Sequence, residues 1–265
     1  MDSNAATALL FTFIAGGATA IGAALTFFVK KDDFKIFALG MSFSAGVMIY
    51  LSFMEILPMS IEHMADTVNG VASFTERGGH IAAVLVFFAG VILAGIIDYL
   101  VPEHVDHDMI GAEPKKAKAT HAALLTAIAL SIHNFPEGLS VFVTSLENVS
   151  VGAAVAVAIM LHNIPEGMSV ALPVYSATGS KKKAFWWATL SGLAEPAGAI
   201  VAYLLLLPFL SPALVGGALA LTAGIMVYIS LDELLPMAKE YGEEHYGIIG
   251  VFLGMALMAA VSIIF

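Results

Sequence analysis

The sequence predicts an all-α integral membrane protein with eight transmembrane helices and both termini outside. Three observations support this fold class: an apolar composition, a series of long apolar runs, and an uneven distribution of basic residues. Hydrophobic residues make up 59% of the 265 residues and charged residues only 12%. The mean hydropathy is +0.91. Soluble domains carry roughly 25% charged residues, so this chain lacks the polar groups to cover its surface and must be solvated mainly by lipid.

The apolar runs define the expected elements, because an α-helix needs about 20 apolar residues to cross a bilayer. The first three predicted helices cover about 5–29, 34–60 and 79–100, and a cytoplasmic loop follows at about 101–119. The next two cover about 120–146 and 150–176, and the last three about 183–208, 212–237 and 246–265. We treat residues 1–265 as one domain. The first run follows no basic residues, which favours a retained helix over a cleaved signal.

The basic residues indicate how the helices are oriented. Ten of the eleven lysines and arginines follow the first, third, fifth or seventh predicted helix, and only Arg77 follows the second. Loops rich in lysine and arginine stay in the cytoplasm. Both termini are therefore expected on the outer side, in keeping with an even number of helices. The chain has no cysteine, which excludes disulfides and thiolate metal sites.

Two pairs of internal repeats lie in the apolar runs. The segment "HNFPEG" at 133–138 recurs 29 positions later as "HNIPEG" at 162–167. The segment "GVMIYLSFMEILPMSIE" at 46–62 recurs 178 positions later as "GIMVYISLDELLPMAKE" at 224–240. In both pairs the two copies fall on helices of opposite predicted direction. Inverted repeats around a site in the middle of the membrane are typical of secondary transporters.

Polar residues of the repeats fall near the centre of the bilayer. With a rise of about 1.5 Å per residue, six of them and Glu195 lie within about two turns of it; the six are His133, Asn134, Glu137, His162, Asn163 and Glu166. A carboxylate at this depth costs at least ~2.5 kcal/mol on insertion scales. No lysine or arginine lies near these residues in their spans, so the compensating charge has to come from elsewhere, and a bound metal ion can supply it.

The spacing of these residues favours a metal site. His133 and Glu137 are four residues apart, as are His162 and Glu166, and such pairs share one face of a helix. The prolines of the motifs interrupt the helical hydrogen bonds, which is tolerated at membrane depth beside a protein-lined cavity. A lone buried histidine is more often a hydrogen-bonded core residue. Duplication, shared depth and the adjacent glutamates favour metal binding over that interpretation.

The motifs resemble those of the ZIP (ZRT/IRT-like) family of divalent-metal transporters. The resemblance rests on "HNFPEGLSVFVTS", "LHNIPEGMSVALPVYSATGSKK", "SGLAEPAG", "SAGVMIYLSFMEILP" and "MVYISLDELLP", and it runs through all eight predicted helices. It implies a 3+2+3 inverted-repeat architecture and import toward the cytoplasm. It also implies that the first, fourth, fifth and sixth helices move against the other four, although the sequence leaves channel-like and elevator-like transport open.

The resemblance also implies a binuclear site. One metal position would be formed by Met48, His133, Glu137, His162 and Glu166, and the other by Asn134, Glu137, Asn163, Glu166 and Glu195. Glu55 is expected on the outer access path to these positions and Glu233 on the exit path. We interpret Asp98 and Asp232 as residues that reach from helix ends toward water. His104 and His107 lie in the 101–119 loop, which we interpret as solvated, with metal capture as the alternative.

The resemblance therefore implies a transporter of the bacterial cell (inner) membrane and not an enzyme. We expect it to import zinc, and also iron, manganese, cobalt and cadmium, as substrates, with no organic cofactor. Its expected partners are divalent metal ions and the lipid bilayer, without nucleic acid, and a homodimer is one assembly that the sequence permits. Two alternatives remain: an intramembrane zinc-dependent hydrolase, which normally carries H-E-x-x-H rather than H-N-x-P-E, and a zinc protein that does not transport.

Overall fold

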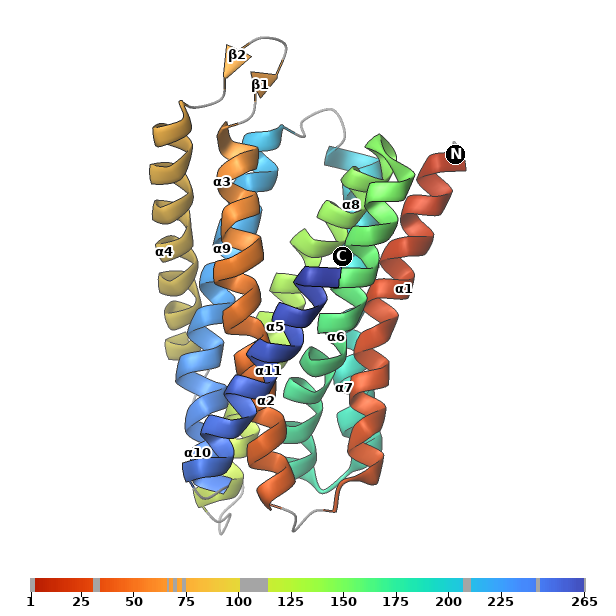
Figure 1. Cartoon of the computed structure of the whole chain (residues 1–265). Coiled ribbons are helices and arrows are strands. Elements are labelled where there is room, and N and C mark those ends of the chain that lie inside the picture. The colour runs from red at the N-terminus through yellow and green to blue at the C-terminus, as the bar shows by residue number, and fades with distance from the viewer. Residues whose placement is uncertain are drawn as a thin grey trace.

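The computed structural model describes residues 3–30, 34–65, 67–68, 71–72, 75–100, 114–206, 211–241 and 244–264. They form one elongated bundle of helices with a small hairpin at one end (Figure 1). The helices are α1 (Ser3–Leu25), α2 (Phe34–Leu51), α3 (Leu57–Ala65), α4 (Glu76–Leu100), α5 (Pro114–Glu147), α6 (Val149–Thr178), α7 (Lys181–Gly192), α8 (Ala194–Val201), α9 (Pro212–Ile229), α10 (Leu235–Tyr241) and α11 (Glu244–Ile264).

Several of these helices join end to end. A π-helical turn, Ser52–Ile56, connects α2 to α3, and another, Ser230–Leu234, connects α9 to α10. A single turn residue, Leu193, separates α7 from α8, which continues into a third π-helical turn at Ala202–Leu206. The described residues therefore form eight helical stretches, and their bounds differ from those of the eight predicted runs by at most six residues.

Six helical stretches are long and apolar enough to cross a membrane: Asn4–Phe28, Lys35–Ala65, Glu76–Leu100, Val155–Thr178, Pro212–Lys239 and His245–Ile263. The other two stretches, α5 and the α7–α8 pair, do not meet this criterion within the described residues. Their sequences give the reason, since α5 starts with lysines and carries the first HNxPEG motif, and α7 begins with three lysines and ends at the break. The structure thus supports six of the eight predicted spans by length and composition.

A short hairpin departs from the all-α prediction. Thr67–Val68 (β1) pairs antiparallel with Val71–Ala72 (β2) beyond the end of α3. The sequence between the strands is Asn-Gly, the pair that most favours a tight hairpin turn. The hairpin lies at the end of the bundle where α4 begins, far from the lysine-bearing start of α7 (Figure 1).

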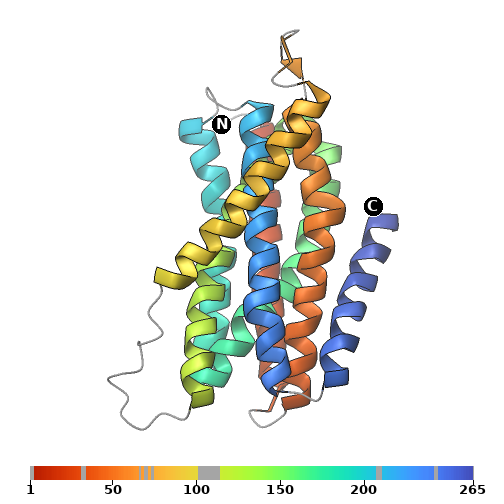
Figure 2. The ribbon, with the colours of Figure 1, turned by 90° about the vertical axis from the view of Figure 1, so that its left-hand side faces the viewer.

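The helices pack as two groups. In one, α1 and α5 both pack on α6, and α8 packs on α5. In the other, α11 packs on α2, while α3 and α4 pack on α9. The groups meet mainly where α2 contacts α6 and where α5 contacts α9. Figure 2 shows α11 at the edge of the bundle beside α2. The first group contains the first, fourth, fifth and sixth predicted helices, and the second group contains the other four. These are the two sets that the family resemblance expects to move relative to each other.

Close helix contacts follow the 178-residue repeat. A Cβ atom on Gly46 would overlap the carbonyl of Val251 in α11, and a Cβ on Gly224 would overlap that of Phe87 in α4. Gly46 and Gly224 are matched positions of the repeat. The π-helical turns are matched as well, because Ser52–Ile56 and Ser230–Leu234 are separated by the same offset. The repeat seen in the sequence is therefore a repeat of structure.

The contacts of α1 yield a stability prediction. A Cβ on Gly22 would overlap the backbone carbonyl of Ile164 in α6, whereas a Cβ on Gly17 would meet nothing within 4 Å. Gly22→Ala should therefore destabilise the protein by about 1–3 kcal/mol, as overpacking does. Gly17→Ala should be neutral or slightly stabilising, because alanine is the better helix former. Thermal unfolding in detergent measures both, and equal melting temperatures would contradict the close packing of α1 on α6.

Candidate metal site

The first HNxPEG motif meets the second at the contact of α5 and α6. His133 Nε2 lies 3.0 Å from Glu166 Oε1 and 3.4 Å from Glu137 Oε1. One ligand atom from each of the three residues lies within 4.8 Å of the other two. All three side chains are buried. These distances suit a site in which one cation contacts three side chains. The predicted pairing of His133 with Glu137 on one face of α5 is present.

The two asparagines are oriented by helix carbonyls. Asn134 Nδ2 donates to the carbonyl of Ser191 in α7 at 3.2 Å, and Asn163 Nδ2 donates to the carbonyl of Ala15 in α1 at 2.8 Å. Asn163 Nδ2 also donates to Glu195 Oε1, at the first turn of α8. Each amide group is thus engaged through its nitrogen, which leaves the amide oxygen as the atom available to a metal ion.

Several buried polar atoms of this region have no hydrogen-bond partner among the described residues. They include His133 Nδ1, Asn134 Oδ1, Asn163 Oδ1, Glu166 Oε2 and Glu195 Oε2. A buried polar atom without a partner costs about 1–3 kcal/mol, and more when it is charged. These atoms are acceptors or, in the case of Nδ1, either acceptor or donor depending on the tautomer. Their concentration in one place is what a site that accepts a cation requires.

The prolines of α5 and α6 and the turn between α7 and α8 lie next to the carboxylates of the site. Pro136 and Pro165 lie inside α5 and α6 and cannot donate to the preceding turn. The turn at Leu193 lets α8 start anew, so Glu195 lies in its first turn, where the helix dipole favours a negative charge. Gly138 brings α5 directly against the backbone of Glu195, which a Cβ atom would overlap. Close packing of α5 on α8 therefore brings the backbone of Glu195 next to the first HNxPEG motif.

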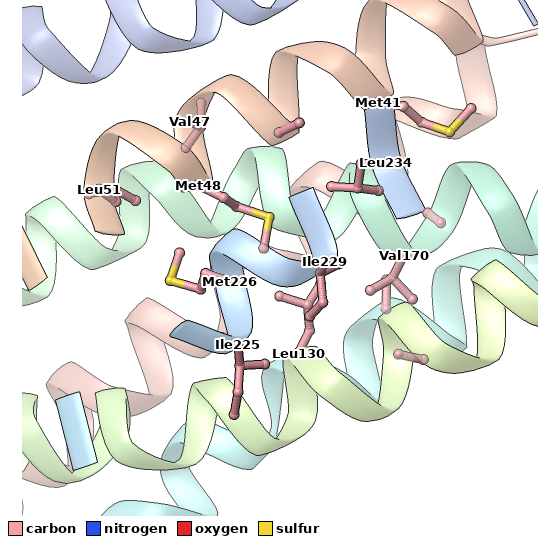
Figure 3. Packing of buried hydrophobic residues seen from close by; sticks show 14 of the residues in the cluster. Met41, Val47, Met48, Leu51, Leu130, Val170, Ile225, Met226, Ile229 and Leu234 are labelled. Atoms are coloured by element: carbon pink, nitrogen blue, oxygen red, sulfur yellow. The ribbon is translucent and has the colours of Figure 1, made fainter. Parts of the chain in front are cut away.

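Met48 comes from the other group of helices. It lies on α2, fully buried in the main apolar cluster (Figure 3). Ser44, one turn before it, donates from Oγ to the carbonyl of Pro165 at 2.7 Å, which fixes α2 against α6 at the second HNxPEG motif. Figure 3 shows Met226, the repeat partner of Met48, nearby, and Ser52 Oγ contacts its sulfur at 3.6 Å. Met48 therefore lies one turn after a residue that contacts the second HNxPEG motif.

Glu55 and Glu233 occupy matched π-helical turns, Glu55 between α2 and α3 and Glu233 between α9 and α10. Glu55 is half-buried and accepts a hydrogen bond from Ser262 of α11. Glu233 is buried and forms a second acidic cluster with Asp98 of α4 and Asp232, in which one oxygen of each lies within 4.8 Å of the others. The predicted site residues thus fall into a central group and two outlying ones.

The predictions for Asp98 and Asp232 are only partly matched by the structure. Asp232 is exposed, as expected for a helix-end residue. Asp98 is half-buried and accepts a hydrogen bond from Tyr228 Oη at 2.9 Å, so it belongs to the Glu233 cluster. Sequence reasoning missed this grouping because the two aspartates are 134 positions apart on α4 and the π-helical turn after α9. The side chain of His162 lies outside the described part of the structure, as do His104 and His107.

The donor set defines the chemistry of the central group. Imidazole nitrogen and carboxylate oxygen are ligands for zinc, and the oxygen-rich neighbours also accept iron, manganese or cobalt. The cluster contains no thiolate, since the sequence has no cysteine. The bundle and this buried donor set together define a multi-pass helical membrane protein with a candidate site for divalent metal ions.

The comparison with known proteins agrees with this class. A family described as "ZIP Zinc transporter" matches residues 101–262. "Zinc transporter ZupT" of Corynebacterium aurimucosum is 48% identical over 96% of this chain and 95% of its own. Proteins of the same name are similar too: that of Streptococcus mutans is 45% identical over the full length of both chains, and that of Chlorobium phaeovibrioides 49% identical over 95% of each. The chain therefore belongs to the ZIP family, and so to transporters rather than enzymes.

Proposed function

We propose that this protein imports zinc, and also iron, manganese, cobalt and cadmium, across the bacterial inner membrane into the cytoplasm. The observation that carries the proposal is the buried His133–Glu137–Glu166 cluster on the contact of two helices that each contain a proline beside the site. The names of the relatives support zinc as the substrate. In the proposed topology residues 1–265 form one domain, all eight helical stretches cross the membrane, and both termini lie outside. We propose no organic cofactor, and a homodimer as one assembly.

The proposed binding site holds two metal positions. Met48, His133 and the side chain of His162 serve the first position. Asn134, Asn163 and Glu195 serve the second. Glu137 and Glu166 bridge the two, because each stands four residues after the histidine and three residues after the asparagine of its motif. Two divalent ions would offset the charge of three buried carboxylates, because the lysines of α5 and α7 lie at the starts of these helices, 12 or more residues from Glu137 and Glu195.

The outlying carboxylates mark the two ends of the proposed path. Glu55 with Ser262 lies on the outer side, and Glu233 with Asp98 and Asp232 on the cytoplasmic side. The outer group has one carboxylate and the inner group three, so the inner group attracts a cation more strongly. Conduction needs binding that is favourable enough to admit the ion and weak enough to release it. A set of imidazole, amide and carboxylate ligands without thiolates meets this requirement.

Transport by purified protein in liposomes tests the proposal. Vesicles with the reconstituted protein should accumulate zinc that is protected from an external chelator, and protein-free vesicles should not. A metallohydrolase or a non-transporting zinc protein would bind zinc without accumulating it in the lumen. Protein that is folded and reconstituted but gives no accumulation would contradict the proposed function.

A carboxylate on the outer access path should affect the capture of dilute metal. Glu55→Gln should therefore raise the KM for zinc uptake by about threefold to tenfold with a smaller fall in maximal rate, because one charge that attracts the cation is lost. Uptake kinetics at equal expression provide the measurement. Glu76→Gln is the matched control, since Glu76 is exposed in the first turn of α4 on the same side. A lower yield of folded Glu55→Gln protein with unchanged KM would indicate a structural role instead.

A further inference from the structure

The central site has a second internal symmetry, between α1 and the α7–α8 pair. A Cβ on Gly22 of α1 would overlap the carbonyl of Ile164, and a Cβ on Gly198 of α8 would overlap that of Phe135. Gly22 and Gly198 are 176 positions apart, and Phe135 and Ile164 are 29 apart, which is the offset of the HNxPEG repeat. The packing of α1 on α6 therefore repeats the packing of α8 on α5.

Hydrogen bonds at the site follow the same relation. Asn134 Nδ2 donates to the carbonyl of Ser191, and Asn163 Nδ2 donates to that of Ala15, which again lies 176 positions earlier. At this offset the residue of α1 that corresponds to Glu195 is Thr19. The site residues His133, Asn134 and Glu137 have counterparts of the same type in the second motif. Glu195 is matched by a hydroxyl instead of a carboxylate.

The Thr19 hydroxyl is buried and unpaired. Thr19 is 1% exposed, and its Oγ1 has no hydrogen-bond partner among the described residues. Buried hydroxyls elsewhere on the first helical stretch donate to a carbonyl of the preceding turn, as Thr12 does to Leu9 and Thr26 does to Ala23. The equivalent carbonyl for Thr19, three residues earlier, is that of Gly16, and Thr19 makes no such bond; the carbonyl of Ala15, four residues earlier, accepts from Asn163. Thr19 thus departs from the pattern of its own helix at the point where that helix meets the site.

The surroundings of Thr19 place its hydroxyl at the helix break. A Cβ on Gly192 would lie 2.7 Å from both Cβ and Oγ1 of Thr19, so no side chain separates Thr19 from the end of α7. The break at Leu193 and the start of α8 at Ala194, one residue before Glu195, follow directly. On the other side, a Cβ on Gly167 would overlap the Thr19 carbonyl, which places Thr19 against the residue after Glu166. Thr19 therefore lies between the residue after Glu166 on α6 and the end of α7, three residues before Glu195.

We propose that Thr19 is a further metal-site residue, whose hydroxyl contacts the ion or its bound water opposite Glu195. The inference rests on the proposed metal site and adds a residue that neither HNxPEG motif contains. An uncharged oxygen here completes the coordination while keeping the number of carboxylates at three. A fourth carboxylate would hold a divalent ion more tightly and slow its release.

Zinc binding to the purified full-length protein tests the role of this hydroxyl. Thr19→Val removes the hydroxyl at nearly constant volume and should weaken zinc binding about tenfold, the lower end of the effect of losing an outer-shell metal partner. Thr19→Ser keeps the hydroxyl and should stay within about twofold of the wild type. Thr12→Val is the matched control, because Thr12 is equally buried on the same helix and bonds only locally. Calorimetry gives the affinity, and zinc uptake into liposomes gives the rate.

The outcomes separate this inference from the proposed function. Glu195→Gln is measured in parallel. Weaker binding in Glu195→Gln with unchanged binding in Thr19→Val overturns the role of Thr19 and leaves the metal site intact. Unchanged binding in both overturns the second metal position and the Thr19 inference together. Thr19→Asp provides a second test, which can be made even if Thr19→Val is unstable. The Thr19→Asp variant should bind zinc more tightly and take it up more slowly than the wild type. Equal or weaker binding by the folded variant contradicts the proposal.

Discussion

Glu166→Ala should reduce zinc uptake to less than about a tenth of the wild-type rate. In the structure Glu166 is fully buried and lies 3.0 Å from His133, and the proposed site makes it a bridge between two metal positions. Loss of even an outer-shell partner costs 10–100-fold in metal affinity or activity, and a bridging ligand serves two ions. Glu137→Ala should be similarly inactive, because Glu137 is the other proposed bridge.

The measurement is initial zinc uptake at equal amounts of folded protein. Asn134→Ala and Asn163→Ala should be milder, since an amide contributes one oxygen and no charge. Ser131→Ala is a matched control on α5, because its hydroxyl donates only to the carbonyl of Ala127 in its own helix. Near-normal uptake by Glu166→Ala would refute the bridging role. An asparagine variant as inactive as the glutamate variants would refute the ranking by charge.

Metal affinity should fall steeply as the pH is lowered from about 7 to about 5. A histidine binds metal only when neutral, so protons compete with the ion for the same atom. With an ordinary histidine pKa of about 6.5, one such ligand loses about 30-fold in affinity at pH 5, and a second one multiplies that loss. The sign is fixed by the chemistry: a lower pH protonates His133, His162 and then the carboxylates, and each proton has to leave before the metal binds.

Calorimetry in buffers of different ionisation enthalpy reports the released protons directly. His133→Gln is the informative comparison, because it should bind zinc more weakly at pH 7 but depend less on pH between 7 and 5. His63→Gln is the control for a histidine outside the site, on α3 near the contact with α9. Affinity that is unchanged across this range, without proton release, would exclude the midplane histidines as ligands. The HNxPEG motifs would then need another explanation.

Much of the fold could be predicted because lipid imposes a simple rule on sequence. A helix that crosses the bilayer must be apolar over about 20 residues, so the apolar runs give the helical stretches directly. Two kinds of element could not be predicted from this rule. The hairpin at 67–72 lies beyond the apolar runs, and the π-helical turns at Ser52–Ile56 and Ser230–Leu234 depend on hydrogen-bond register, which hydropathy does not reveal.

The central site was predictable for a related reason. A histidine and a glutamate four residues apart share a helix face wherever the helix goes, and charged groups at membrane depth are rare without a function. The pairing of His133 with Glu137 therefore follows from the sequence. Its proximity to Glu166 follows only from the packing of α5 on α6, although the duplication of the motif was a strong indication.

The sequence by itself thus determined the helical class, the depth of the polar motifs and the pairs that lie on one helix. Tertiary structure decided every contact between helices: Asn163 with Glu195, Ser262 with Glu55, and Asp98 with the Glu233 cluster. It also revealed Thr19, which no motif marks, because its neighbours come from α6 and α7. The physical reason is that local spacing fixes geometry only within one helix. Which faces then meet depends on close backbone approach, at glycines such as Gly22, Gly138 and Gly198, and is settled only when the whole bundle packs.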